Sequence, residues 1–137
     1  MSRIINPDSA GKERSRLTKS VVLAVRALAQ LTEPGAESRD LAAFISLALA
    51  SISETIDVSV AAWEKRGYWV KADRFRMDWS WAGQYAKSMR IALFAEDWAE
   101  VARVAAQTAQ RLQKITVPAG HHLGTPWIGA WKVIQEK

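Results

Sequence analysis

Apolar residues recur along this chain at alternating spacings of three and four, which is the pattern of amphipathic α-helices. Four long segments carry the pattern, and the breakers between them are few: Pro34-Gly35, Gly67, and the stretch from Pro118 to Gly120. No segment shows the period-two alternation of a half-buried β-strand. The pattern therefore predicts an all-α protein.

The four segments have recognisable ends. The first helix is expected to begin after Asp8-Ser9 and to run to about Thr32, the second from Ser38 or Asp40 to Arg66, the third from about Tyr68 to Phe94, and the fourth from Glu96-Asp97 to Pro118. Asp8-Ser9 can cap the first helix, and acidic residues at the starts of the second and fourth suit the positive end of a helix dipole. Four such helices with short turns fold most economically as an antiparallel up-down-up-down four-helix bundle.

The third segment has the most regular apolar seam. Its members are Ala72, Phe75, Trp79, Ala82, Ala86, Met89 and Leu93. Small seam residues allow close approach of helices, and large aromatic rings fill the seam at other levels. We interpret the seam tryptophans Trp63, Trp79 and Trp98 as core side chains rather than as the lining of a ligand pocket.

The chain divides into a bundle and a tail. Its 137 residues are the size of one domain, with the bundle expected over residues 1–118 and an irregular, Trp-rich tail over residues 119–137. Disordered termini are normally poor in large apolar residues, but this tail contains four of them: Leu123, Trp127, Ile128 and Trp131. We expect the tail to pack on its own bundle, with packing on a second subunit or capture of another partner as the alternatives.

The third segment also carries apolar residues on the side opposite its seam, where a surface helix is normally polar. These residues are Val70, Met77, Trp81 and Ile91. Either the chain covers this side too, or the stripe joins another molecule. We expect residues 123–131 to pack there, near Met77, Trp81 or Ile91, within the chain or across a subunit boundary.

Two groups of basic residues are candidates for binding an anionic partner. The net charge is +5 at pH 7, although the acidic segment 34–66 neutralises part of the charge of its neighbours. One group is a stripe on the first helix: Lys12, Arg16, Lys19 and Arg26. The other is a cluster interleaved with Tyr68, Trp69 and Phe75: Lys65, Arg66, Lys71, Arg74 and Arg76. Phosphate contacts and base stacking would suit both groups. The favoured interpretations are a solvated face for the stripe and a helix–helix junction for the cluster.

Residues suited to catalysis are scarce. The chain has no Cys, which excludes disulfides and thiolate chemistry. Its two histidines, His121 and His122, are neighbours, and adjacent side chains seldom bind one metal ion, so a role in a turn or in anchoring the tail is favoured. No Glu-x-x-His pair and no glycine-rich phosphate loop occur. We expect no enzymatic activity, no metal and no cofactor.

Localisation is inferred from two segments. Met1–Asp8 has an acid and a proline where a signal peptide has basic and apolar residues. The apolar window 41–52 is shorter than the roughly 20 residues that cross a bilayer, so it is interpreted as a buried core helix. A cytoplasmic protein with no membrane partner is expected.

No motif identifies a biochemical activity, so function is inferred from surfaces. The favoured hypothesis is a non-enzymatic helical-bundle interaction or scaffold protein that self-associates or binds another protein. The alternative is a basic nucleic-acid-binding module, or an adaptor to a nucleic-acid enzyme.

Overall fold

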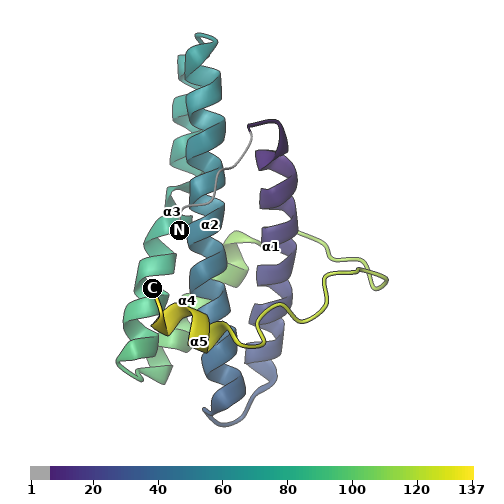
Figure 1. Cartoon of the computed structure of the whole chain (residues 1–137), viewed down its shortest axis with the longest axis vertical. Coiled ribbons are helices and arrows are strands. Elements are labelled where there is room, and N and C mark those ends of the chain that lie inside the picture. Colours follow the sequence, from purple (N-terminus) through teal and green to yellow (C-terminus); the bar gives the residue numbers. More distant parts are fainter. Residues whose placement is uncertain (1–6) are drawn as a thin grey trace.

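The computed structural model describes residues 7–137, with side chains from Ser9 onward. In this range the chain forms five helices and no strand. They are α1 (Pro7–Gln30), α2 (Ala36–Lys65), α3 (Trp69–Phe94), α4 (Trp98–Arg111) and α5 (Ala130–Gln135), shown in Figure 1. The prediction of an all-α protein is confirmed. The expectation about a targeting signal falls mainly on residues outside the described range.

The fourth helix is shorter than expected, and a fifth lies in the tail. α4 ends at Arg111, seven residues before Pro118. The intervening run Ile115-Thr116-Val117 is β-branched, and the residue before a proline is disfavoured in α conformation, so the helix has no reason to continue. Leu112 is nevertheless buried and Ile115 packs against the core. The apolar seam therefore continues past the end of the helix.

The start of α2 also differs from the expected position. The Ser38 hydroxyl accepts a hydrogen bond from the Gly35 N–H (2.6 Å) and donates one to the Gly35 carbonyl (2.9 Å). Ser38 thus occupies the third position of the helix and folds back on the cap, instead of being the cap itself. The helix begins at Ala36 as a result.

α2 is the central helix and contacts all four others. Its buried residues include every large apolar side chain of the window 41–52 except the half-buried Phe44 and Leu47. By length and composition alone α2 could cross a membrane, but more than half of its most apolar stretch is buried inside the fold. A core helix of this kind has the same composition as a spanning one.

A closed turn joins α2 to α3. The Tyr68 N–H donates to the Trp63 carbonyl (2.9 Å) and the Gly67 N–H donates to the Glu64 carbonyl (3.0 Å), with Gly67 in the left-handed region at φ +82°. This is a Schellman motif, which satisfies the carbonyls at the end of α2. The turn makes α2 and α3 a helical hairpin with a well-defined end.

The two helices of the hairpin approach closely. A Cβ atom on Gly83 would lie 3.1 Å from the Ser53 hydroxyl. One turn farther along α3, the Ser46 hydroxyl donates to the Ala86 carbonyl at 2.8 Å. Small residues at the crossing allow serine side chains of α2 to meet the backbone of α3 directly, in line with the close approach that the alanine-rich seams predicted.

The hairpin extends beyond the other helices (Figure 1). We call the part of the hairpin toward this protruding end, residues 55–79, the tip, and the part where α1, α4 and α5 surround the hairpin the base. The base holds the main core, to which all five helices contribute. The tip has a small core of its own: Ile56, Val60 and Ala72, with Trp63, Phe75 and Trp79 against them.

Candidate interaction surface

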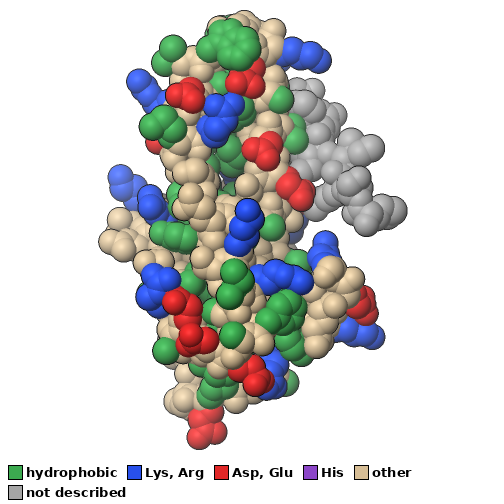
Figure 2. Space-filling model, turned by 90° about the vertical axis from the view of Figure 1, so that its left-hand side faces the viewer, with side chains coloured by type: hydrophobic (Ala, Val, Ile, Leu, Met, Phe, Trp, Pro, Cys, Tyr) green, Lys and Arg blue, Asp and Glu red, His purple; other side chains and the backbone are tan. Residues whose placement is uncertain are grey.

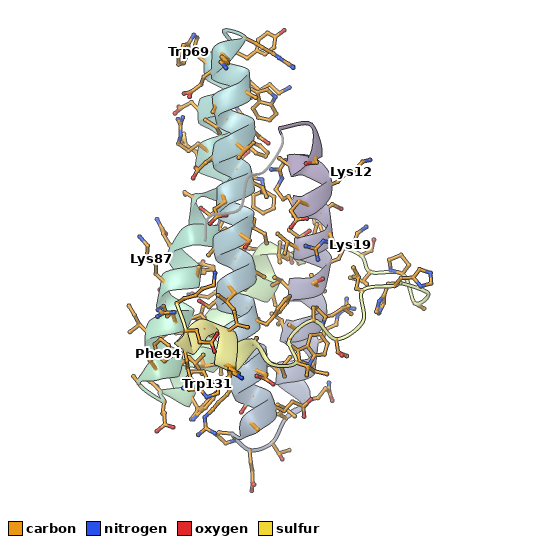
Figure 3. All side chains as sticks on the ribbon, viewed as in Figure 1. Lys12, Lys19, Trp69, Lys87, Phe94 and Trp131 are labelled. Carbon is orange, nitrogen blue, oxygen red and sulfur yellow. The ribbon has the colours of Figure 1, made fainter. Side chains whose placement is uncertain are left out.

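The C-terminal tail packs on its own chain. Ala130 and Ile134 of α5 are buried, and Trp127 meets Phe44 of α2 edge-on at 6.5 Å between ring centroids. Trp131 lies 5.4 Å from Phe94 at the end of α3 (Figure 3). Leu123 is half-buried and Ile128 is exposed. The tail thus covers α2 and the last turn of α3, and the prediction that it covers Met77, Trp81 or Ile91 within the chain is wrong; packing of the tail on these residues across a subunit boundary stays a prediction.

Two charged side chains from the hairpin hold the ends of α5. The Asp40 carboxylate accepts hydrogen bonds from the Gly129 N–H (3.1 Å) and the Trp131 N–H (2.9 Å). Arg90 donates to the carbonyls of Ile134 (3.4 Å) and Lys137 (3.3 Å) at the other end. The anion meets the amide end of α5 and the cation meets its carbonyl end, which suits the dipole of this short helix. Sequence reasoning missed both anchors because their partners lie 89 and 44 residues away.

Trp81 is buried, contrary to its expected place on an exposed stripe. Only 6% of it is exposed. Its ring stacks on Trp79 at 5.6 Å, contacts Tyr85 at 5.5 Å and lies 6.0 Å from the guanidinium of Arg111 at the end of α4. Because α2 and α4 both pack on α3, the buried arc of α3 is wider than a single seam and includes Trp81.

The other three members of the stripe are exposed: Val70 (75%), Met77 (69%) and Ile91 (70%). They are separated by two and four turns of helix, so they do not form a continuous patch. Figure 2, which faces the α3 side, shows hydrophobic side chains in separate groups between charged ones, with one group at the upper end. That upper group belongs to the end of the molecule that the tip forms.

The most concentrated exposed apolar surface is at the apex of the tip. Tyr68 (55% exposed), Trp69 (63%) and Val70 (75%) follow one another directly after the turn at Gly67. Together with Gly67 and Lys71 they line a shallow, open hollow. Trp69 lies at the far end of the long axis of the molecule, at the turn between α2 and α3 and away from the other three helices (Figure 3). Tight turns are normally polar, so three exposed apolar residues here are unusual.

The basic cluster of the sequence surrounds this apex. Arg76 is paired with Glu64 (3.0 Å) and Asp73 (3.2 Å), and the Lys71 ammonium lies 4.5 Å from the Trp63 ring centroid. Lys65, Arg66 and Arg74 are exposed, and no carboxylate among the described residues pairs with them. α3 also begins without an acidic residue in its first turn, so no acid at the start of this helix offsets the cations.

Part of the basic cluster therefore forms a helix–helix junction, and part of it is available to bind an anionic partner. Arg76 and Phe75 belong to a helix junction, with Phe75 half-buried against Trp63 at 4.8 Å. The three unpaired cations are free to meet an anionic surface.

The basic stripe runs along α1. Lys12, Arg16 and Arg26 are exposed and Lys19 is half-buried. Arg16 is paired with Glu13 at 2.9 Å, while the other three have no acidic partner in the described part of the chain. Lys12 and Lys19 lie well below Trp69 along the long axis (Figure 3). The stripe and the apex are thus separate basic surfaces.

Arg14 joins α1 to the lower part of the tip and was not singled out from the sequence. Its guanidinium donates to the carbonyl and hydroxyl of Thr55 (both 3.3 Å) and to the Ser59 hydroxyl (3.4 Å). It also lies 4.8 Å from the centroid of the Phe75 ring. Partial burial lowers the pKa of this guanidinium below its usual value. A usable signal was its position three residues before the seam residue Leu17.

Among the described residues, two features bear on catalysis or metal binding: a cavity lined in part by polar groups, and the grouping of titratable side chains. A cavity of about 370 Å³ lies between α2, α3 and α5 and is open to solvent; four charged residues (Glu54, Lys87, Arg90 and Lys137), two serines and several apolar residues line it. No three His, Asp or Glu side chains gather as a metal site requires within the described part of the chain. The Nδ1 atom of His121 accepts a hydrogen bond from the Leu123 N–H at 3.2 Å, which places this histidine in a local turn.

Comparison of the chain with protein-family models, with curated proteins and with solved structures finds no match. Function is therefore inferred from the apex of the tip, the basic cluster around it and the basic stripe on α1.

Proposed function

We propose that this protein is a non-enzymatic interaction or scaffold protein that binds an anionic partner through the tip. In this proposal α1 to α4 alternate in direction as an antiparallel up-down-up-down bundle, and the base serves as a rigid support. The absence of Cys suits a reducing compartment such as the cytoplasm.

The observation that carries the proposal is the exposed apex, Tyr68, Trp69 and Val70. The backbone of the turn is already satisfied by its own hydrogen bonds, so folding does not require large apolar side chains there. Exposed apolar groups rimmed by charge mark interaction sites. Trp, Tyr and Arg are also the residues that contribute most at binding interfaces.

The choice of an anionic partner follows from charge. Lys65, Arg66 and Arg74 surround the apex without acidic partners among the described residues. Two copies of the chain meeting apex to apex would bring these cations together, which is unfavourable. Self-association through the outer face of α3 has weaker support, because Trp81 is buried and Val70, Met77 and Ile91 are far apart.

Nucleic-acid binding is the second candidate, favoured by one specific observation. Two exposed aromatic rings, Tyr68 and Trp69, lie beside unpaired cations, and single-stranded nucleic acid binds by stacking on rings flanked by positive charge. The stripe on α1 adds a second phosphate-binding candidate.

Three anionic probes and one mass measurement test the proposal. The full chain is titrated at about 50 mM salt with a single-stranded oligonucleotide, with polyglutamate and with anionic lipid vesicles, and its mass is followed by light scattering. We expect at least one probe to bind, and the double variant Tyr68→Ser/Trp69→Ser to lose that binding. Ile128→Ser, which removes an equally exposed apolar residue from the tail, is the matched control. If no probe binds, the proposal is wrong.

A further inference from the structure

We infer that the tip is an anchor for the surface of an anionic lipid bilayer, with Tyr68, Trp69 and Val70 entering the headgroup region and Lys65, Arg66 and Arg74 contacting lipid phosphates. This inference depends on the proposed function, since it names the partner of the same surface. Four observations lead to it: the shape of the apex, its residue types, the position of its cations and its place in the molecule.

The shape of the apex suits a membrane better than a protein pocket. It is the narrow end of two helices, each about 10 Å across, with only a shallow, open hollow, so its end-on cross-section is about 200 Å². A stable protein interface needs about 800 Å² on each partner. A bilayer surface has no such requirement, because each apolar side chain that enters it contributes by itself.

The residue types at the apex are those of a membrane interface. Trp and Tyr are enriched at the headgroup level, where one side of the ring is apolar and the other hydrogen-bonds with water and lipid. Val70, the most exposed of the three, is aliphatic and offers nothing to a stacked base. This favours lipid over single-stranded nucleic acid as the partner.

The three unpaired cations lie within about one turn of helix of the apex. Lys65 and Arg66 end α2 immediately before the turn, and Arg74 lies one turn of helix behind Val70. Long basic side chains reach toward lipid phosphates while apolar neighbours enter deeper. Arg76 already neutralises Glu64 and Asp73, so those acids oppose an anionic surface less than free ones would.

The apex lies at one end of the long axis of the molecule (Figure 3). Contact through the apex would stand the hairpin on the membrane and hold the base away from it, as the vertical axis of Figure 1 illustrates. The tail and the stripe on α1 would then remain accessible to other molecules. The sequence led us to expect no membrane partner, but that expectation considered only targeting and spanning segments, which a peripheral anchor does not need.

The test is co-sedimentation of the full chain with vesicles of phosphatidylcholine and phosphatidylserine, compared with vesicles of phosphatidylcholine alone. We expect binding to the anionic vesicles that weakens as salt increases. Trp69→Ser should reduce the partition constant by at least about tenfold. Neutralising Lys65, Arg66 and Arg74 together with Gln should reduce it by about 100-fold, at roughly fivefold per cation.

Two control variants test whether vesicle binding depends on the tip itself or on positive charge and exposed apolar residues anywhere on the molecule. Neutralising Lys12, Lys19 and Arg26 with Gln removes the same number of charges from the stripe on α1, and Ile128→Ser removes an exposed apolar residue elsewhere. Both should bind anionic vesicles as the parent does. Circular dichroism verifies that each variant remains helical.

The outcomes distinguish this inference from the proposed function. Binding of the oligonucleotide or polyglutamate through the tip, without vesicle binding, overturns the lipid anchor and leaves the proposed function intact. Failure of every probe overturns both. Vesicle binding that is lost in the stripe variant but kept in the tip variants also overturns the lipid anchor.

Discussion

The base and the tip are built from the same two helices and differ in what surrounds them. In the base, α2 is enclosed by α1, α3, α4 and α5. In the tip, α1 contacts α2 and α3 only at the lower end, through Arg14, and α4 does not reach the apex, because it has 14 residues against the 26 of α3. Trp81 of α3 is consequently buried in the base, whereas Trp69 and Val70 of α3 are exposed at the apex of the tip.

The contrast shows that the exposure of a side chain on α3 depends on its position along the helix as well as on its residue type. Trp81 and Trp69 lie on the same helix, yet 6% of the first and 63% of the second is exposed. α4 supplies a cover for Trp81 through Arg111, and nothing in the described chain covers Trp69. The base thus encloses its tryptophan, and the tip leaves one exposed.

The largest expected effect comes from truncating one isoleucine in each core. Ile52 belongs to the base core and Ile56, one turn later on α2, belongs to the tip core. Ile52→Ala should lower the free energy of unfolding by about 4 to 5 kcal/mol and Ile56→Ala by about 2 kcal/mol, since the less enclosed tip can relax around the cavity. Urea unfolding measures both. Equal losses would contradict the distinction between base and tip.

The second-largest loss of stability is expected where the tail packs on the base. Asp40→Ala removes both hydrogen bonds to the start of α5 and should lower stability by about 1 to 3 kcal/mol. Exchange of the Gly129 and Trp131 amide protons should accelerate most. Asp40→Asn keeps an acceptor oxygen and should show a smaller change. Unaltered exchange at these two amides in Asp40→Ala would mean that apolar packing alone holds α5.

A smaller effect is expected where α1 meets the tip. Arg14→Met removes the contacts with Thr55, Ser59 and Phe75 and should cost about 1 kcal/mol. A double-mutant cycle with Phe75→Leu should give a coupling free energy of about 0.5 to 1 kcal/mol. Arg16→Met, on the solvated side of the same helix, is the control. An absence of coupling would show that Arg14 does not join the two regions through the ring.

The smallest stability effect is expected at the apex. Trp69→Ser should change the free energy of unfolding by no more than about 0.5 kcal/mol, because this side chain is largely exposed. Trp81→Ser should lower it by about 3 kcal/mol or more, since that ring is buried among Trp79 and Tyr85. Thermal unfolding of the two variants provides the comparison. A comparable loss at Trp69 would indicate a structural role for the apex.

Much of the fold was predictable because helical periodicity is a local property. The α3 seam holds as predicted: Ala72, Ala82, Ala86, Met89 and Leu93 are buried and Phe75 and Trp79 are half-buried. The burial of Trp81 could not be deduced in this way, since it depends on how far around α3 a second helix packs. The candidate surface was predicted in part, because the basic cluster was recognised but Tyr68, Trp69 and Val70 were not recognised as its exposed apex.

By itself the sequence determined the helical class, the positions of the turns at Pro34-Gly35 and Gly67, and the apolar character of the tail, because each depends on spacing and residue type within a few turns of helix. Only the tertiary structure decided where the tail packs and which apolar residues remain uncovered. Asp40 and Arg90 meet α5 across 89 and 44 residues, and the relative lengths of α3 and α4 leave the apex bare. Such contacts follow from the arrangement of whole helices in space, which no local pattern specifies.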